Sequence, residues 1–407
     1  MKKTFLAMAL SALAGVACGR SGGAHGELFA GNTAQQKSPE SGWQETLSRP
    51  GIRQADGSLC PSDQDEIYGT CIPKKQGFTV VQGEIYRQGE LVQLKGINWF
   101  GLDTGKHSLH GLWTGRSLES YLRQVKELGF NALRIPVAPE ALQETTVGDD
   151  GYAHPLDEIK ALLQLAEQLH LFILFDIHNC SADAGYTTGT PTFCPNYGVD
   201  AWKRDLKTLA ELTKTSTYTV GIDLYNEPYK LSWDDWHSMA EDAARVVLTS
   251  NPSLLVFVEG VGDLSSSGQH ATFWGENLYP FKSKPLNIPR SRLVLSPHTY
   301  GPSVYAEHVY FKDQSFPNNM PGVWDEHFGF LRDLGYPVAV GEFGGRLQGK
   351  DAEWQIAFIS YLRQRNIRHF FYWSLNPDSG DTGGILLDDW QSVDTAKMQA
   401  LQQILQN

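Results

Sequence analysis

The sequence predicts a (β/α)8 TIM barrel with an N-terminal extension and a small β-hairpin. Two observations indicate this fold. From Leu94 onward, short apolar runs alternate with amphipathic segments of helical period, as parallel strands joined by covering helices require. Polar residues follow directly after the apolar runs, and a barrel of this class keeps its active site at the carboxyl ends of its strands.

Eight apolar runs supply the expected strands. They are Leu94–Ile97, Ala132–Ile135, Leu171–Phe175, Val220–Leu224, Leu254–Val258, Leu293–Leu295, Pro337–Val340 and His369–Tyr372. A doubly wound open sheet shows the same alternation, but it needs a glycine-rich phosphate turn after the first strand. Residues 96–101 contain no Gly-x-Gly-x-x-Gly pattern, so the closed barrel is the preferred architecture.

The helical segments carry start and stop signals. Ser117 is a suitable N-cap for a helix whose apolar positions recur every three or four residues from Leu118, and Gly129 ends it. We expect further helices in the segments Leu156–Leu169, Ala201–Leu212, Trp236–Thr249, Trp324–Leu334 and Trp354–Arg365.

Residues 1–18 are typical of an export signal. Two lysines precede an apolar run, Phe5–Val16, that is too short to span a bilayer. Residues 15–18 resemble a bacterial lipoprotein box, although Gly15 stands where leucine is usual. Cys18 is therefore a candidate for lipidation, with plain cleavage near Ala17 as the alternative. We expect a bacterial protein that is secreted, periplasmic or lipid-anchored at the cell surface.

Two further parts follow this signal. Residues 19–76 form a tether, rich in Gly, Ser, Gln and Ala up to residue 59, and then a disulfide-closed arm. Residues 77–407 form the main domain. It opens with Phe78–Val81, Glu84–Tyr86 and Leu91–Leu94, which alternate as short strands of a lid hairpin.

The chain has five cysteines. If Cys18 is lipidated, Cys60, Cys71, Cys180 and Cys194 remain, and four cysteines allow three pairings. We prefer the nearest-neighbour pairing, Cys60 with Cys71 and Cys180 with Cys194, because it closes two short loops. Free thiols are the alternative.

Composition narrows the class of partner. With 407 residues, 41% of them hydrophobic and 20% charged, the chain is long enough for a large core and is not disordered. The net charge of -12 disfavours nucleic acid, whose phosphates need clustered Lys and Arg. A neutral substrate and a monomer are expected. The 11 Trp include candidates for stacking on sugar rings, although most Trp in any protein fill the core.

Two glutamates stand at the ends of apolar runs. Glu227 lies in Asn226–Glu227–Pro228 after the fourth run, and Glu342 follows the seventh. Strands that each deliver a carboxylate at the carboxyl end supply what double displacement at a sugar anomeric carbon needs.

Other polar or aromatic residues collect at the same strand ends. They are Arg134, His178, Asn226, Glu259, His298, Tyr300 and Trp373. A single Glu there is more often a helix-start charge, and a lone His is more often a satisfied structural group. The recurrence after successive runs is what favours a common site.

Several motifs in the right order are similar to a known family. They are Ile97–Gly101, His110–Trp113, Leu133–Pro136, Asn226–Pro228, Ser296–Tyr300, Gly341–Gly344 and Trp373–Gly384. Across residues 78–400 the chain resembles glycoside hydrolase family 5, especially bacterial endo-β-1,4-glucanases.

The resemblance implies a retaining (β/α)8 hydrolase that cleaves internal β-1,4-glucosidic bonds of a β-glucan polysaccharide or oligosaccharide. It implies Glu227 as acid/base and Glu342 as nucleophile, and no metal or cofactor. The residues it places around the cleaved sugar are Arg134, His178, Asn226, His298, Tyr300 and Trp373.

Individual roles can be assigned within this site. We expect Arg134 and Tyr300 to hold Glu342 ionised, Asn226 to donate to the 2-hydroxyl, and Trp373 to form the floor under the reacting ring. Candidates for stacking further along the groove, with core filling as the alternative, are Trp113, Trp99, Trp233 and Trp236.

Alternatives remain at this point. Glu259 is a rival carboxylate, interpreted here as a supporting residue. A metal-dependent hydrolase would use His178 and His298, but no His-x-His or His-Glu-x-x-His spacing accompanies them. An inert glycan-binding barrel would be expected to lack one carboxylate. Within the glycosidase interpretation, β-mannan, xyloglucan or a glycosylated lipid are alternative substrates.

Overall fold

The computed structural model describes residues 60–61, 63–148, 151–182, 194, 196–262 and 272–406. These residues belong to one compact unit, Gly51–Asn407. The export signal, Cys18 and the tether up to residue 59 lie outside the described residues. No described helix combines the length and apolar character that crossing a membrane requires.

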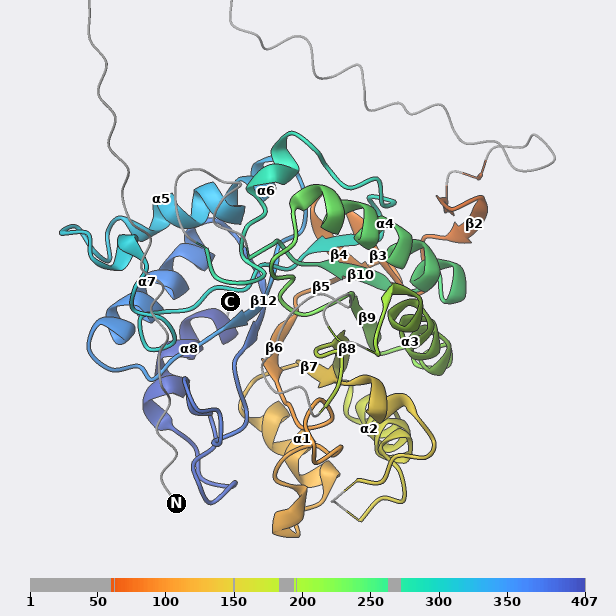
Figure 1. Cartoon of the computed structure of the whole chain (residues 1–407), viewed down its shortest axis with the longest axis horizontal. Helices are drawn as coiled ribbons and strands as arrows, with labels where there is room; N and C mark the ends of the chain where they lie inside the picture. The colour runs from red at the N-terminus through yellow and green to blue at the C-terminus, as the bar shows by residue number, and fades with distance from the viewer. Residues whose placement is uncertain are drawn as a thin grey trace, which may run out of the picture. The chain divides into compact units, whose positions relative to one another are not determined.

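Eight parallel strands form the centre of the molecule (Figure 1). They are β6 (Lys95–Asn98), β7 (Ala132–Val137), β8 (Phe172–Ile177), β9 (Thr219–Asp223), β10 (Leu255–Val258), β11 (Leu293–Leu295), β12 (Ala339–Phe343) and β13 (His369–Tyr372). The order is β11-β10-β9-β8-β7-β6-β13-β12, and the bridges Leu295↔Val338 and His298↔Glu342 join the two ends. The predicted (β/α)8 barrel is confirmed.

Helices surround these strands (Figure 1). The α-helices are α1 (Leu118–Glu127), α2 (Pro155–Leu169), α3 (Val199–Leu212), α4 (Trp233–Ser250), α5 (Met320–Trp324), α6 (Phe330–Asp333), α7 (Lys350–Gln364) and α8 (Thr395–Leu405). Short 3-10 turns are η1 (Leu112–Thr114), η2 (Pro139–Leu142), η3 (Tyr279–Lys282) and η4 (Val309–Phe311). The Ser117 side chain accepts the backbone N–H of Ser120 and caps α1 as predicted.

One predicted helix is interrupted. The segment expected as Trp324–Leu334 consists of the end of α5, a π-helical turn at Asp325–Gly329, and α6. The Tyr361 hydroxyl donates to Asp325 at 2.8 Å, and a Cβ at position 329 would lie 1.9 Å from that hydroxyl. Only glycine lets Tyr361 approach this closely. A periodicity argument does not contain this tertiary contact.

The hairpin predicted as a lid lies at the amino ends of the barrel strands. It is a three-stranded antiparallel sheet of β3 (Phe78–Val81), β4 (Glu84–Arg87) and β5 (Glu90–Val92). Backbone N–H groups of Phe78 and Val80 donate to carbonyls of Ser253 and Ser291, which precede β10 and β11. The hairpin therefore closes the end of the barrel opposite to the predicted site.

Its apolar side chains continue into the barrel interior. Phe78 and Ile85 are buried in one cluster with Val220, Leu255 and Phe371 from the barrel strands. This cluster fills the amino-terminal half of the barrel, which leaves the polar side chains to the other half.

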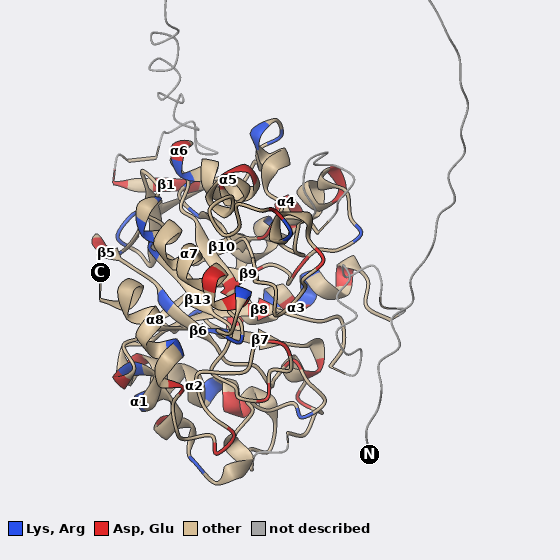
Figure 2. Cartoon of the chain, turned by 90° about the vertical axis from the view of Figure 1, so that its left-hand side faces the viewer, with Lys and Arg blue, Asp and Glu red and all other residues tan. Residues whose placement is uncertain are grey.

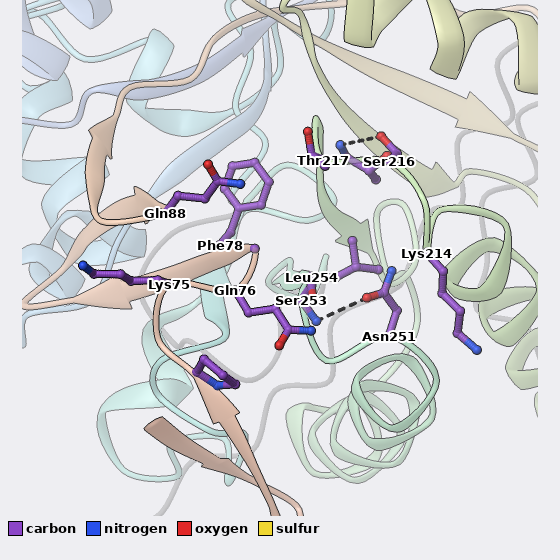
Figure 3. Close-up of a pocket in the computed structure, with 13 residues that line it drawn as sticks. Lys75, Gln76, Phe78, Gln88, Lys214, Ser216, Thr217, Asn251, Ser253 and Leu254 are labelled. Atoms are coloured by element: carbon purple, nitrogen blue, oxygen red, sulfur yellow. Dashed lines mark hydrogen bonds between the residues drawn. The ribbon is translucent and has the colours of Figure 1, made fainter. Parts of the chain in front are cut away.

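A cavity of about 500 Å³ lies beside the hairpin (Figure 3). Gln76, Gln88, Lys214, Asn251 and Ser253 are among the residues that line it. None of the predicted catalytic or sugar-binding residues lines this cavity.

The described cysteines form two disulfide bonds. One joins Cys60 to Cys71 around the hairpin of β1 (Gln64–Ile67) and β2 (Thr70–Pro73), and the other joins Cys180 to Cys194 after β8. The pairing is the nearest-neighbour one. The second bond spans the insertion that follows the third barrel strand.

Candidate active site

Two glutamates meet at the carboxyl ends of the strands. Glu342 lies near the end of β12, and Glu227 lies four residues beyond β9. One oxygen of each carboxyl group and a ring nitrogen of His298 all lie within 4.8 Å of one another. Figure 2 shows acidic and basic segments gathered near the middle of the barrel, around β8, β9 and β13.

Glu342 is buried and receives two strong donors. Arg134 Nη1 donates to its Oε1 at 2.7 Å, and the Tyr300 hydroxyl donates to its Oε2. His298 Nδ1 lies 3.6 Å from Oε2. Donors on both oxygens fix the direction in which the carboxylate points.

Arg134 is the fixed cation beneath the site. Its guanidinium is completely buried and also contacts Asp176 at 3.1 Å, Asp223 at 3.2 Å and Glu259 at 3.2 Å. Burial alone would lower the pKa of Arg134, but the surrounding carboxylates raise that pKa well above its usual value. The guanidinium therefore stays charged.

Glu227 occupies a different environment. Its side chain is 15% exposed, and His298 Nδ1 lies 3.2 Å from its Oε1. Burial raises the pKa of Glu227 to about 7, the contact with His298 lowers it, and the negative charge of Glu342 raises it. A carboxyl group of this kind can exchange a proton near neutral pH.

The two histidines are both held by carboxylates. His298 lies between Glu227 and Glu259, with Nε2 at 3.1 Å from Glu259 Oε1. Burial would lower the pKa of His298, but Glu259 and Glu342 raise it well above the usual value. For His178, burial is again outweighed, and Asp176 at 2.6 Å raises its pKa to about 9.

Asn226 and Trp373 complete the predicted set. Arg134 Nη2 donates to Asn226 Oδ1 at 3.1 Å, so the amide NH2 is the donor group that remains for a ligand. The Trp373 ring lies nearly parallel to two neighbouring rings, that of His178 with centroids 5.7 Å apart and that of Phe100 with centroids 5.3 Å apart. The fold thus brings together Arg134, His178, Asn226, His298, Tyr300 and Trp373.

An aromatic row extends outward from Trp373. Phe100 contacts His110 with centroids 5.1 Å apart, and His110 contacts Trp113 at 5.0 Å. Trp113 is 46% exposed and can present a ring face to a ligand. We call Trp373, Phe100, His110 and Trp113 the aromatic row.

Three of the proposed stacking residues are in the core. Trp99 and Trp236 are completely buried and Trp233 is 5% exposed, so stacking on a sugar is wrong for all three. Trp236 instead donates its Nε1–H to the carbonyl of Glu259 at 2.9 Å, which is a supporting role. Sequence spacing could not separate these rings from Trp113, because helix and strand periods do not report depth in the core.

Two acidic residues were missed by the sequence reasoning. Asp176 and Asp223 are both completely buried, and both contact Arg134. Their signal was an Asp inside an otherwise apolar strand, which is costly unless a cation lies opposite. Arg134, in the second apolar run, is that cation for both.

Among the residues that the structure describes, two groups of side chains are close enough to hold a metal ion. They are Asp223, Glu259 and His298, and Glu227, His298 and Glu342. Arg134 already contacts Asp223, Glu259 and Glu342, so its guanidinium supplies positive charge to both groups.

A closed barrel that holds two carboxyl groups with oxygens within 4.8 Å of each other, one of them with a near-neutral pKa, is the arrangement of a glycoside hydrolase. The family model described as cellulase (glycosyl hydrolase family 5) matches residues 88–379. The chain belongs to this family.

Named relatives agree with this placement. The chain is 40% identical over 340 residues to the major extracellular endoglucanase of Xanthomonas campestris pv. campestris, covering 77% of this chain and 68% of the relative. It is 35% identical over 358 residues to an endoglucanase of Paenibacillus polymyxa, covering 81% and 87%.

Solved structures are similar over the same region. The catalytic domain of the Xanthomonas enzyme has a TM-score of 0.76 at 37% identity, covering 81% of this chain and 100% of that domain. An endocellulase from Pyrococcus horikoshii in complex with cellotetraose has a TM-score of 0.76 at 32% identity, covering 82% and 99%. The chain is thus an endoglucanase-like glycoside hydrolase.

Proposed function

We propose that this enzyme is a retaining endo-β-1,4-glucanase that cleaves cellulose or a related β-glucan, with Glu342 as nucleophile and Glu227 as acid/base. The observation that carries the proposal is the approach of the two carboxyl groups, with oxygens within 4.8 Å. Retaining enzymes hold their carboxyl groups about 5–5.5 Å apart, whereas inverting enzymes need about 6.5–9.5 Å to seat a water.

The first step forms a covalent glycosyl-enzyme. Glu342 Oε attacks the anomeric carbon, the bond from that carbon to the leaving oxygen breaks, and Glu227 gives its proton to the leaving oxygen. Arg134 and Tyr300 keep Glu342 aimed through their contacts with its two oxygens. The amide NH2 of Asn226 is the donor available to the sugar 2-hydroxyl.

The second step returns both groups to their starting states. Once Glu342 is esterified, its charge no longer raises the pKa of Glu227, so Glu227 becomes the stronger acid and remains deprotonated. Glu227 then accepts a proton from water while the water oxygen attacks the anomeric carbon and the bond to Glu342 breaks. Inversion at each step gives net retention.

The substrate class is supported by the relatives and by the aromatic row. The relatives from Xanthomonas and Paenibacillus are named endoglucanases, and the Pyrococcus endocellulase forms a complex with cellotetraose. An exposed Trp113 continuous with Trp373 suits a chain of pyranose rings. Because the Xanthomonas relative is named extracellular, we also propose that this enzyme acts outside the cytoplasm.

Azide rescue tests the roles. Glu342→Ala should lose turnover by at least about a thousandfold and, with azide and an activated aryl β-cellobioside, should form the α-cellobiosyl azide. Glu227→Ala is the matched control, because azide should then give the β-azide from the intact glycosyl-enzyme. A Glu342→Ala variant that keeps wild-type turnover overturns the assignment.

The substrate is tested by reducing-sugar release from carboxymethyl cellulose, lichenan, mannan and xyloglucan in parallel. Faster release from mannan or xyloglucan than from both glucans would replace the proposed substrate. EDTA in the same assay should change nothing. Loss of activity that added metal restores would favour a metal-dependent reaction at His298 and its carboxylate partners.

A further inference from the structure

We propose that Glu259 is a positioning residue for the acid/base Glu227, because it holds both the backbone of Glu227 and the histidine that contacts its carboxyl group. The inference rests on the proposed role of Glu227. Glu259 follows β10, is completely buried, and reaches no substrate itself.

The first contact fixes the main chain. The backbone N–H of Glu227 donates to Glu259 Oε2 at 2.8 Å. Glu227 has a φ of +49°, a left-handed conformation that is unfavourable for a non-glycine residue. The hydrogen bond from this N–H to the Glu259 carboxylate stabilises the left-handed conformation. That conformation in turn sets the direction in which the Glu227 side chain points.

The second contact fixes the side chain. Glu259 Oε1 lies 3.1 Å from His298 Nε2, and the opposite ring nitrogen, Nδ1, lies 3.2 Å from Glu227 Oε1. The imidazole therefore bridges the two glutamates. Displacement of Glu259 would release Glu227 at its backbone and at its carboxyl group together.

Glu259 is itself held on three sides. Its carbonyl accepts from Trp236 Nε1 at 2.9 Å, and its Oε1 accepts from Arg134 Nη2 at 3.2 Å. On the third side lies Gly275, where an added Cβ would be 2.3 Å from Oε2. Gly275 has a φ of +74° and accepts the N–H of Gly260 at 2.9 Å, so its backbone stays in contact with the carboxylate.

The charged groups that surround Glu259 come from several strands. They are Arg134, Asp176, Asp223, Glu227 and His298, and two of them, Arg134 and His298, also contact Glu342. Glu342 has its own donors, Arg134 and Tyr300. A change at Glu259 should therefore disturb proton transfer from Glu227 more than attack by Glu342.

Leaving-group dependence separates these two effects. A 2,4-dinitrophenyl β-cellobioside needs no proton to leave, whereas a phenyl β-cellobioside does. The quantity to compare is kcat/KM, which reports the steps up to the first irreversible bond cleavage. Three variants are measured: Glu259→Gln, Glu227→Ala as the benchmark, and Glu158→Gln as the control.

Glu158 is a matched control because it is also a completely buried glutamate that accepts a backbone N–H, from Leu109 at 2.9 Å. Its hydrogen-bond partner, Leu109, is not one of the proposed catalytic residues. Its replacement should lower stability without changing the ratio of the two kcat/KM values.

Glu259→Gln should lower kcat/KM for the phenyl substrate about a hundredfold and should lower it at least about tenfold less for the dinitrophenyl substrate. Gly275→Ala should give the same pattern by displacing Glu259, with Glu259 and Glu227 both present. Thermal midpoints of all variants show that each is folded at the assay temperature.

Equal losses for both substrates in Glu259→Gln, or no loss for either, overturn the inference. Glu227→Ala without any leaving-group dependence would instead overturn the proposed function, so the two failures are distinguishable.

Discussion

Glu227 and Glu342 are the same residue type in one small space, and their surroundings make them different. Glu342 faces a buried guanidinium and a phenol hydroxyl, both of which donate to it. Glu227 faces one histidine and is removed from water, which raises its pKa to about 7. Donors on one side and desolvation on the other divide the proposed roles of nucleophile and acid.

The raised pKa of Glu227 predicts the basic side of the pH profile. Above about pH 7 Glu227 loses the proton that it must donate, so kcat/KM for an unactivated β-glucan oligosaccharide should fall about tenfold per pH unit. The dinitrophenyl β-cellobioside should lack this fall, because its leaving group needs no proton. Initial rates from pH 5 to pH 9 on both substrates measure the difference. An identical fall for both would contradict the assignment.

At the residue scale, placement after an apolar run predicted which side chains meet at the site. It did not predict the buried residues that hold those side chains in place. The strand-end rule located Arg134, His298 and Glu342 because parallel strands place their carboxyl ends together. It did not locate Asp176 on β8 and Asp223 on β9, whose side chains lie within their strands and compensate the charge of Arg134 on β7. That compensation is visible only when register is known.

At the element scale, the turn η1 presents the outer end of the aromatic row. Trp113 sits in η1, its ring packs against His110 and Trp390, and 46% of the residue is exposed. A rigid ring supported on two sides costs little conformational entropy when a sugar binds to it. The row is therefore suited to a chain longer than the two residues beside the cleaved bond.

Trp113→Ala should weaken the use of long substrates selectively. Loss of one stacking face costs about 1 kcal/mol, so KM for a cello-oligosaccharide long enough to reach Trp113 should rise about fivefold with kcat little changed. Steady-state kinetics on cellohexaose and on a cellobioside measure this. Leu91→Ala, at an exposed site on β5, is the control. An equal rise for both substrates would exclude Trp113 from the outer groove.

At the scale of the whole molecule, the barrel has two ends with separate tasks. The hairpin β3–β5 fills the amino end with apolar side chains, and the carboxyl end holds the charged network. The sequence predicted that this hairpin exists but placed it as a lid. The alternation of apolar and polar residues predicts which face of the hairpin is buried. It does not predict which end of the barrel that face covers.

Ile85→Ala should separate stability from catalysis. Ile85 is completely buried under the barrel, so truncation should lower the free energy of unfolding by about 2–5 kcal/mol. The kcat below the unfolding transition should stay within about twofold of wild type, since the carboxylates lie at the other end. Thermal denaturation and initial rates measure both, with Val81→Ala, 45% exposed on β3, as the control. A large drop in kcat for Ile85→Ala would contradict this separation, because it would show that packing at the amino end of the barrel affects catalysis at the carboxyl end.

The pairing of β11 with β12 closes the barrel, and it bears on how the enzyme loses activity on heating. We call this pairing the seam. Every other pair of neighbouring barrel strands shares at least three paired residues, whereas this seam has two bridges. One of the two joins His298 to Glu342. Because local openings cost less free energy than global unfolding, we expect mild warming to separate this short ladder first, and activity should then be lost while the remaining strands are still paired.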